Sequence, residues 1–347
     1  MSRVVDSTDI AIVGDGVIAW ACAWEIARRG RRVVVLGEGA SSASSAAAGM
    51  IAPASEAVLD GIDGKTAELW RRAAAAWEAS ALELGIDLRR SGGLHVGHPD
   101  ELASRSSLAQ ALGFAAEETA DGLLLLGDYV LDPAIVLRAL RHKAEAAGTV
   151  FRAGRVVFGP DGPRFDGRPF KIPRVLIAAG WGAATLAGWA PELAVLEPIK
   201  GQLLKVEGFA AGPTIRAQGA YLAPQAWGWA VGATMEVGRS DLTPDAERSA
   251  ELMSAAVAAR PELAGARHTT AVGVRAATPD GAPLVGPSRT PGVLLAAGMR
   301  RNGWLLAPLV AQAVAAYEDG APDAVLGGQA HAWDPARVFK TPAEGTA

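Results

Sequence analysis

The chain has a single cysteine among its 347 residues, so it cannot form an intrachain disulfide or a cysteine-rich zinc site. Its five histidines form no HxxxH pair. Its net charge of -4 comes without a basic run, which excludes the electrostatic surface typical of nucleic-acid binders. These absences predict no metal site and no nucleic-acid partner, and they leave small-molecule chemistry as the expected function.

The sequence also has little that resembles a membrane segment, because no stretch reaches the ~18 uncharged apolar residues needed to span a bilayer. The apolar stretch from Ile10 to Trp24 is interrupted by Gly14, Asp15 and Gly16 and follows no basic region, which argues against a signal peptide. We therefore expect a cytoplasmic protein with no membrane partner. The length suits two domains, or one dinucleotide-binding domain that carries an inserted lobe.

The N-terminal region has the pattern of a β-α-β unit. The apolar run Ile10 to Val13 precedes Gly14-x-Gly16-x-x-Ala19 and a helical stretch, and Val33 to Leu36 is predicted to be a second buried parallel strand. Small residues in such a turn let a pyrophosphate approach the backbone at the helix N-terminus. The pattern therefore predicts a dinucleotide site, although it does not separate FAD from NAD.

The rest of the chain alternates between expected helices and strands. Helices are expected over Thr66 to Leu84, after the N-cap Asp132 as far as Gly148, and over Trp304 to Tyr317. Strands are expected at Val175 to Ile177 and Val293 to Ala297, with an antiparallel hairpin over Tyr221 to Met235 that turns at Gly228. The alanine- and serine-rich run from Ala40 to Ala48 is expected to be a loop.

Six further blocks of sequence resemble, in the same order, those of the glycine oxidase branch of the D-amino-acid oxidase family. They are Ser45 to Pro53, Pro198 to Leu203, Tyr221 to Pro224 with Val231 to Glu236, Gly273 to Gly281, Arg301 to Pro308, and Asp334 to Phe339. Six blocks in order are far more specific than one, and they extend over nearly the whole chain. The resemblance implies FAD, and it implies non-covalent binding because Cys22 is far in sequence from the blocks matched to the flavin ring.

The resemblance also implies roles for single residues. Arg275 matches the residue that binds the substrate carboxylate, Tyr221 one that helps to hold it, Arg301 a second arginine near flavin and substrate, and Met235 a residue lining the substrate cavity. Without the resemblance, Arg275 would be interpreted as a surface arginine and Arg301 as a surface charge at a helix N-terminus. Tyr221 and Met235 would be interpreted as core side chains of a hairpin. The positions matched to FAD binding are Gly14, Gly16, Val17, Ile18, Ala19, Glu38, Ser44, Ala48, Gly49, Met50, Val156, Gly180, Met299, Arg300, Arg301, Asn302, Gly303, Trp304 and Leu305.

The implied fold is α/β (α+β), with a Rossmann-like FAD-binding domain and an inserted antiparallel-sheet substrate domain. The FAD-binding domain is expected to comprise residues 1–85, 132–185 and 270–347, and the substrate domain residues 86–131 and 186–269. The implied reaction is the oxidative deamination of glycine or a similar small amino acid, with hydride transfer from the α-carbon to flavin N5. An imine or keto acid and H2O2 are the products, so the expected partners are a small amino acid and O2.

The sequence departs from the family pattern at Ala19, a permitted variant of the third glycine, and at Met299 and Arg300, which displace the usual histidine. Two further departures bear on how tightly FAD binds. Asp15 stands in the first turn, where relatives carry a small neutral residue, and Gly37 stands where the second strand usually ends in a Glu that holds the adenosine ribose. Repulsion between the Asp15 carboxylate and the phosphates favours weak retention of FAD.

Three hypotheses stay open at this point. The first is an oxidase of glycine or a near relative, which includes supply of the imine for the thiazole half of thiamine. The second is a relative recruited to another amine or an N-substituted glycine. The third is a flavin-poor homologue that keeps the fold as a binding protein. The natural substrate and the oligomeric state, homo-oligomer included, are not determined by the sequence.

Overall fold

A six-stranded sheet organises one half of the molecule in the computed structural model, which describes residues 8–39 and 42–339. Its strand order is β19-β20-β12-β1-β2-β8. The strands are β1 (Ile10–Val13), β2 (Val33–Gly37), β8 (Val150–Ala153), β12 (Val175–Ile177), β19 (Leu284–Pro287) and β20 (Val293–Ala297). All neighbours pair in parallel except the edge strand β19. Strands covered on both faces need apolar residues throughout, which explains the sequence IAIV of β1.

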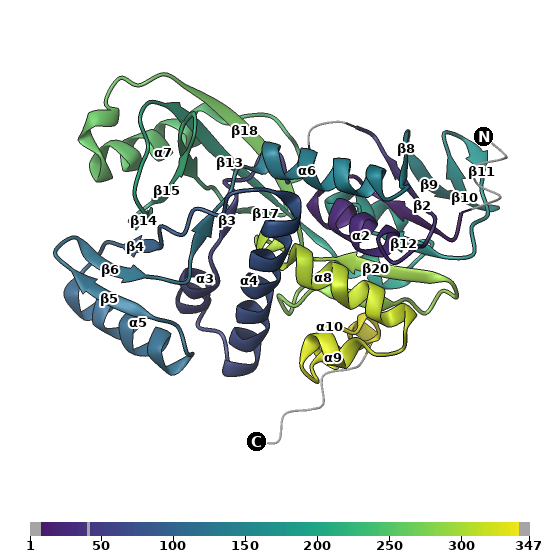
Figure 1. The fold of residues 1–347 in the computed structure, drawn as a ribbon. Helices are drawn as coiled ribbons and strands as arrows, with labels where there is room; N and C mark the ends of the chain where they lie inside the picture. The colour runs from purple at the N-terminus through teal and green to yellow at the C-terminus, as the bar shows by residue number, and fades with distance from the viewer. Residues whose placement is uncertain (1–7, 40–41, 340–347) are drawn as a thin grey trace.

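The two faces of this sheet are covered by different structures. On one face, Ile10 and Ile12 belong to a large core with the helices α2 (Val17–Ala27), α4 (Gly64–Leu84), α6 (Pro133–Ala146) and α8 (Gly303–Glu318). Figure 1 shows α2, α6 and α8 grouped beside the strands of this sheet. On the other face, Ala11 and Val13 pack against the meander β9 (Val156–Gly159), β10 (Gly162–Phe165) and β11 (Arg168–Pro169) and the 3-10 segments Gly180–Leu186 and Pro191–Val195.

A nine-stranded sheet organises the other half. Its order is β17-β13-β16-β15-β14-β4-β6-β5, and β18 pairs with β13. The strands are β4 (Gly93–His95), β5 (Ala116–Thr119), β6 (Gly122–Leu125), β13 (Glu197–Glu207), β14 (Thr214–Ala217), β15 (Ala220–Gln225), β16 (Gly228–Gly232), β17 (Glu236–Val237) and β18 (His268–Ala277). The parallel pairing of β14 with β4 joins the segment 93–125 to the rest of the sheet.

Shorter elements complete the fold. The strands β3 (Met50–Ile51) and β7 (Tyr129–Val130) form a two-stranded sheet. The helices α3 (Pro53–Asp60), α5 (Pro99–Ala111) and α7 (Ala246–Ala259) belong to the half with the larger sheet, whereas α9 (Pro322–Leu326) and α10 (Ala330–Trp333) follow α8. No helix of the described ranges is long and apolar enough to cross a membrane.

The mixed α/β fold and the N-terminal β-α-β unit expected from the sequence are confirmed. The hairpin is also confirmed, but its second strand ends at Gly232 and not at Met235. The chain leaves β15 there because Thr234 turns to β13, where its Oγ1 accepts from the N–H of Gln202 at 2.9 Å. Residues 40–41 of the expected loop lie outside the described ranges. The division into two domains stays a prediction, and β18 lies across its boundary at residue 270.

Candidate active site

Two adjoining cavities contain most of the site residues expected from the sequence. The first, of about 450 Å³, is lined by Gly14, Gly16, Val17, Ile18, Glu38, Ser44, Val156, Gly180, Met299, Arg300 and Gly303. The second, of about 820 Å³, is lined by Ala48, Gly49, Met50, Tyr221, Met235, Asn302 and Leu305. Arg275, Arg301 and Trp304 line both. Ala19 lines neither, because it is fully buried within α2.

The first cavity has the backbone geometry of an anion site. Gly14 has φ +119°, and a Cβ at this residue would lie 2.4 Å from the carbonyl oxygen of Ala178, so only glycine fits between β1 and the end of β12. The helix α2 then begins at Val17 without a side-chain cap. The N–H of Val17 donates to the Oγ of Ser44 at 3.1 Å. The next N–H groups of the first turn and the positive end of the helix dipole remain beside the cavity, which is the arrangement that binds phosphates in dinucleotide sites.

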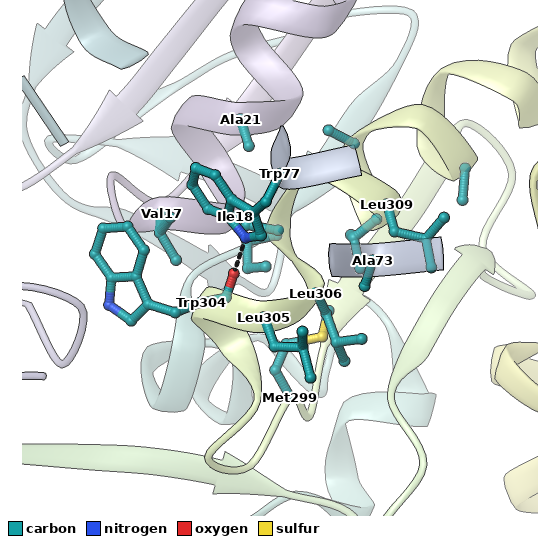
Figure 2. Close-up of a cluster of buried hydrophobic side chains, with 14 of the residues drawn as sticks. Val17, Ile18, Ala21, Ala73, Trp77, Met299, Trp304, Leu305, Leu306 and Leu309 are labelled. Atoms are coloured by element: carbon teal, nitrogen blue, oxygen red, sulfur yellow. Dashed lines mark hydrogen bonds between the residues drawn. The ribbon is translucent and has the colours of Figure 1, made fainter. Parts of the chain in front are cut away.

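The start of α8 is held in place by two indole groups (Figure 2). Pro308 has no N–H and therefore cannot donate to the carbonyl of Trp304, four residues earlier in the helix. The indole Nε1 of Trp77 donates to this carbonyl instead, at 2.6 Å. The indole of Trp304 itself donates to the carbonyl of Ser44 at 3.1 Å. Because α8 also begins without a side-chain cap, its free N–H groups are fixed beside the two cavities.

Arg275 is a half-buried cation without a carboxylate partner among the described residues. Its Nη1 donates only to the carbonyl of Thr234, at 3.2 Å. It lies on β18 opposite Ile199, and a Cβ at the nearby Gly201 would lie 2.0 Å from Nη1, so glycine at this position makes room for the guanidinium. Burial lowers the pKa of Arg275 from its ordinary value. A ligand carboxylate would supply the missing partner.

Tyr221 lies beside Arg275 in the second cavity. It pairs with Gly232 across the hairpin, and a Cβ at Gly232 would lie 2.5 Å from the phenol oxygen. Burial raises the pKa of Tyr221 above its ordinary value, so the phenol keeps its proton and can donate a hydrogen bond to an anion. Met235 lines the same cavity and is 42% exposed, which puts it at the solvent side.

Sequence reasoning missed Glu56, a buried carboxylate that lines the second cavity. Its Oε1 lies 2.8 Å from the Nη2 of Arg216, and its Oε2 accepts from the Nε of Arg301. Burial raises the pKa of Glu56, but the charges of Arg216 and Arg301 outweigh burial, so the net pKa lies below its ordinary value. Arg301 also contacts Asp60 at 2.8 Å. Arg301 is therefore already neutralised, in contrast to Arg275.

The sequence offered only a weak signal for this group. Glu56 is an acidic residue in the first turn of a helix that starts with Pro53. This pattern is common because a negative charge interacts favourably with the helix dipole, so it does not by itself predict a functional site. Arg216 comes from β14, 160 residues further along the chain. Only the assembled sheet brings the two together.

A neutral histidine contacts Arg105, which lines the second cavity. Burial, followed by the charges of Arg216 and Arg105, lowers the pKa of His95 to about 3. Its Nδ1 lies 3.1 Å from the Nη1 of Arg105, and its Nε2 lies 2.8 Å from the Oγ of Ser55. A neutral ring can accept at Nδ1 and donate at Nε2, so His95 orients Arg105 at the cavity wall.

The described residues fit FAD. The glycine turn at Gly14 and the uncapped start of α2 suit its pyrophosphate, and the uncapped start of α8 suits the flavin ring. Cys22 is fully buried and lines neither cavity, so its thiol is not placed to form a covalent link. Within residues 8–39 and 42–339, no cluster of three or more histidine, cysteine or acidic side chains could hold a metal ion.

Comparisons with known proteins identify the family of the chain. The family model described as FAD dependent oxidoreductase (DAO) matches residues 9–317. A glycine oxidase of Geobacillus kaustophilus is 30% identical over 348 residues, which cover 88% of this chain and 92% of that protein. The bifunctional protein ThiO/ThiG of Nostoc sp. is 28% identical over 88% of this chain, which spans 52% of that longer protein.

The fold agrees as well. The crystal structure of glycine oxidase from Geobacillus kaustophilus superposes with a TM-score of 0.79 at 28% identity and covers 90% of this chain and 95% of that chain. The family match extends over both cavities, from the glycine turn after β1 to α8. The protein therefore belongs to the DAO family of FAD-dependent oxidoreductases and resembles its glycine oxidases.

Proposed function

We propose that the protein oxidises glycine or a similar small amino acid, with O2 as the electron acceptor and H2O2 as a product. The observation that carries the proposal is Arg275, a half-buried guanidinium that lines both cavities and has no carboxylate partner among the described residues. A buried cation is costly unless an anion neutralises it. A substrate carboxylate would do so at the point where the two cavities meet.

The protein residues bind and orient this substrate. The planar guanidinium of Arg275 can donate two parallel hydrogen bonds to a carboxylate, and the protonated phenol of Tyr221 can donate a third. Glu56 and Asp60 together neutralise Arg216 and Arg301, so Arg275 remains available to pair with a substrate carboxylate. The amino acid would thus be held with its α-carbon in a fixed orientation.

The cofactor supplies the redox chemistry. When bound, FAD supplies the two-electron acceptor for dehydrogenation of the α-carbon to nitrogen bond, and O2 takes up the electrons. Water hydrolyses the resulting imine to a keto acid and an ammonium ion. The positive end of α8 beside the cavities favours an electron-rich ring at that position.

An N-substituted glycine is a second candidate substrate. The second cavity continues past Arg275 to Val96, His98 and Arg105, which leaves room for a substituent on the amine. Supply of an imine for thiamine synthesis, a cytoplasmic location and assembly into a homo-oligomer stay predictions.

A substrate panel tests the proposal. Purified protein is assayed for H2O2 with glycine, sarcosine and small D-amino acids, each beside the matching amine without a carboxylate. We expect the amino acids to be much the better substrates, because only they neutralise Arg275. An amine that outperformed its amino acid would contradict the proposal, and preference for sarcosine over glycine would favour the second candidate. Protein without flavin absorption would favour a binding protein.

A further inference from the structure

The side chain of Asp15 occupies the end of β2. Its Oδ2 accepts from the N–H of Gly39 at 2.7 Å. A Cβ at Gly37, the last residue of β2, would lie 2.6 Å from the Cβ of Asp15 and 2.8 Å from its Oδ2. No real Cβ approaches other atoms this closely, so a side chain at residue 37 and the present side chain at residue 15 exclude each other.

This place in the fold has a known chemistry. In dinucleotide sites of this topology, an acidic residue at the end of the second strand accepts hydrogen bonds from the adenosine ribose. Residue 37 has no side chain to do this, although both Asp15 and Gly37 line the first cavity. The carboxylate that stands at the end of β2 therefore comes from the turn between β1 and α2.

The neighbouring acid, Glu38, is placed differently. Successive residues of a strand point to opposite sides, so Glu38 does not take the direction of residue 37. Its side chain is 63% exposed, and its Oε1 lies 3.6 Å from the Nε of Arg155. Glu38 is thus a solvated group at the rim of the first cavity.

We propose that Asp15 binds the adenosine ribose of FAD in place of a strand-end acid, and that Gly37 is required because it leaves room for Asp15. Oδ2 is held by Gly39, whereas Oδ1 has no hydrogen-bond partner within the described ranges and can accept from a ribose hydroxyl. The same carboxylate repels a phosphate on that ribose and so disfavours phosphorylated dinucleotides. The inference rests on FAD as cofactor and is independent of the amino-acid substrate.

This assignment reverses the expectation from the sequence alone, in which Asp15 repels the pyrophosphate. The hydrogen bond to Gly39 holds the carboxylate at the end of β2, not over the first turn of α2. Removal of the carboxylate should therefore weaken FAD binding, where a repulsive carboxylate would on removal tighten it.

The test compares the dissociation constant of FAD for flavin-stripped variants by fluorescence titration. We expect Asp15→Asn and Asp15→Gly to weaken FAD binding by about tenfold to a hundredfold, which is the usual effect of losing a hydrogen bond to a charged group. Asp161→Asn is the matched control, because it makes the same replacement at an exposed acid that lines neither cavity, and we expect at most a threefold change, on the order of 0.6 kcal/mol.

A reciprocal exchange makes the test specific. Gly37→Glu alone should bind FAD poorly, because its side chain meets Asp15, whereas Asp15→Gly combined with Gly37→Glu should recover most of the affinity lost in Asp15→Gly. Thermal unfolding of the flavin-free variants identifies any that fail to fold. In that case the FAD dissociation constant of Asp15→Asn, which keeps the size of the side chain, is sufficient to test the proposal. Unchanged or tighter FAD binding by Asp15→Asn, or equal losses in Asp15→Asn and Asp161→Asn, would overturn the proposal.

Discussion

At the scale of single residues, two half-buried arginines of the site differ in their partners. Arg301 contacts two carboxylates, whereas the guanidinium of Arg275 donates to a backbone carbonyl and pairs with no carboxylate among the described residues. Both lie in the same cavity. Their different neighbours predict different roles: Arg301 maintains the charge balance of the cavity, and Arg275 binds the ligand.

Replacement of Arg275 tests this assignment. We expect Arg275→Ala to raise the KM for the amino acid and to leave FAD bound, because loss of a buried charged partner typically costs about 2 to 5 kcal/mol. Arg275→Lys should recover only part of this loss, since one ammonium cannot make the paired contact. The control is Arg337→Ala, which breaks a contact with Asp280 away from both cavities. Unchanged kcat/KM in Arg275→Ala would show that the carboxylate binds elsewhere.

Replacement of Glu56 tests the charge balance. At pH 7 we expect Glu56→Gln to lower the free energy of unfolding by about 3 to 5 kcal/mol, because Arg216 and Arg301 lose their shared buried partner. The folded pKa of Glu56 lies below the ordinary value of 4.5. Its contribution is therefore complete above that pH and is lost as the pH falls through the folded pKa.

Denaturant unfolding at several pH values measures both effects. The difference between wild type and Glu56→Gln should be largest near neutral pH and should shrink on acidification. Glu251→Gln, which breaks an exposed pair with Arg248 on α7, should cost less than about 1 kcal/mol. If Glu56→Gln were as stable as the wild type at pH 7, the buried carboxylate would not hold the two arginines.

At the scale of elements, the position of α8 depends on a hydrogen bond that the helix cannot make for itself. Pro308 leaves the Trp304 carbonyl without its helical donor, and Trp77 on α4 supplies one. We expect Trp77→Phe to destabilise the protein by about 1 to 3 kcal/mol beyond its loss of packing, since a buried carbonyl becomes unsatisfied. Trp70→Phe is the control, because Trp70 is also buried on α4 and donates no hydrogen bond within the described ranges.

A double-mutant cycle isolates this contribution. Pro308→Ala restores a backbone N–H four residues after Trp304, so Trp77→Phe should cost less in the Pro308→Ala background than in the wild type. Equal costs in the two backgrounds, measured by denaturant unfolding, would mean that the Trp77 indole acts only through packing.

The elements also show what the sequence can predict. Local patterns were sufficient to predict the β-α-β unit, α4 and the hairpin of β15 and β16. The signals for these elements, namely glycine turns, helix caps and hydrophobic periodicity, lie in residues that are close together in the sequence. The parallel pairing of β14 with β4 joins segments more than 100 residues apart and has no local signature. The ion pairs of Glu56 and the close approach of the Asp15 side chain to Gly37 could not be predicted for the same reason, since each depends on a contact between segments distant in sequence.

At the scale of the whole molecule, the site is assembled from both sheets. The first cavity is lined by the ends of β1 and β2 from the smaller sheet and by Arg275 from β18 of the larger sheet. The two halves meet where the N–H of Arg300, before α8, donates to the carbonyl of Ala276 at 2.8 Å. A cofactor that extends through both cavities would therefore link segments that are distant in sequence.

Hydrogen exchange tests this linkage. Addition of FAD to flavin-free protein should protect residues 14–19, 272–276 and 299–305 together, because a ligand that binds only the folded state suppresses local opening at its contacts. The helix α7, which lines neither cavity, should exchange at the same rate with and without FAD. Protection confined to residues 14–19 would show that FAD does not reach the second cavity.

The central claim is that bound FAD oxidises an amino acid held through its carboxylate. Its most direct test is anaerobic mixing of the FAD-loaded protein with glycine, sarcosine or methylamine, followed by the flavin absorption. We predict that an amino acid reduces the flavin in the wild type, that methylamine does not, and that Arg275→Ala requires a much higher concentration. Equal reduction by methylamine, or no reduction by any amino acid that carries a free carboxylate, would contradict the claim.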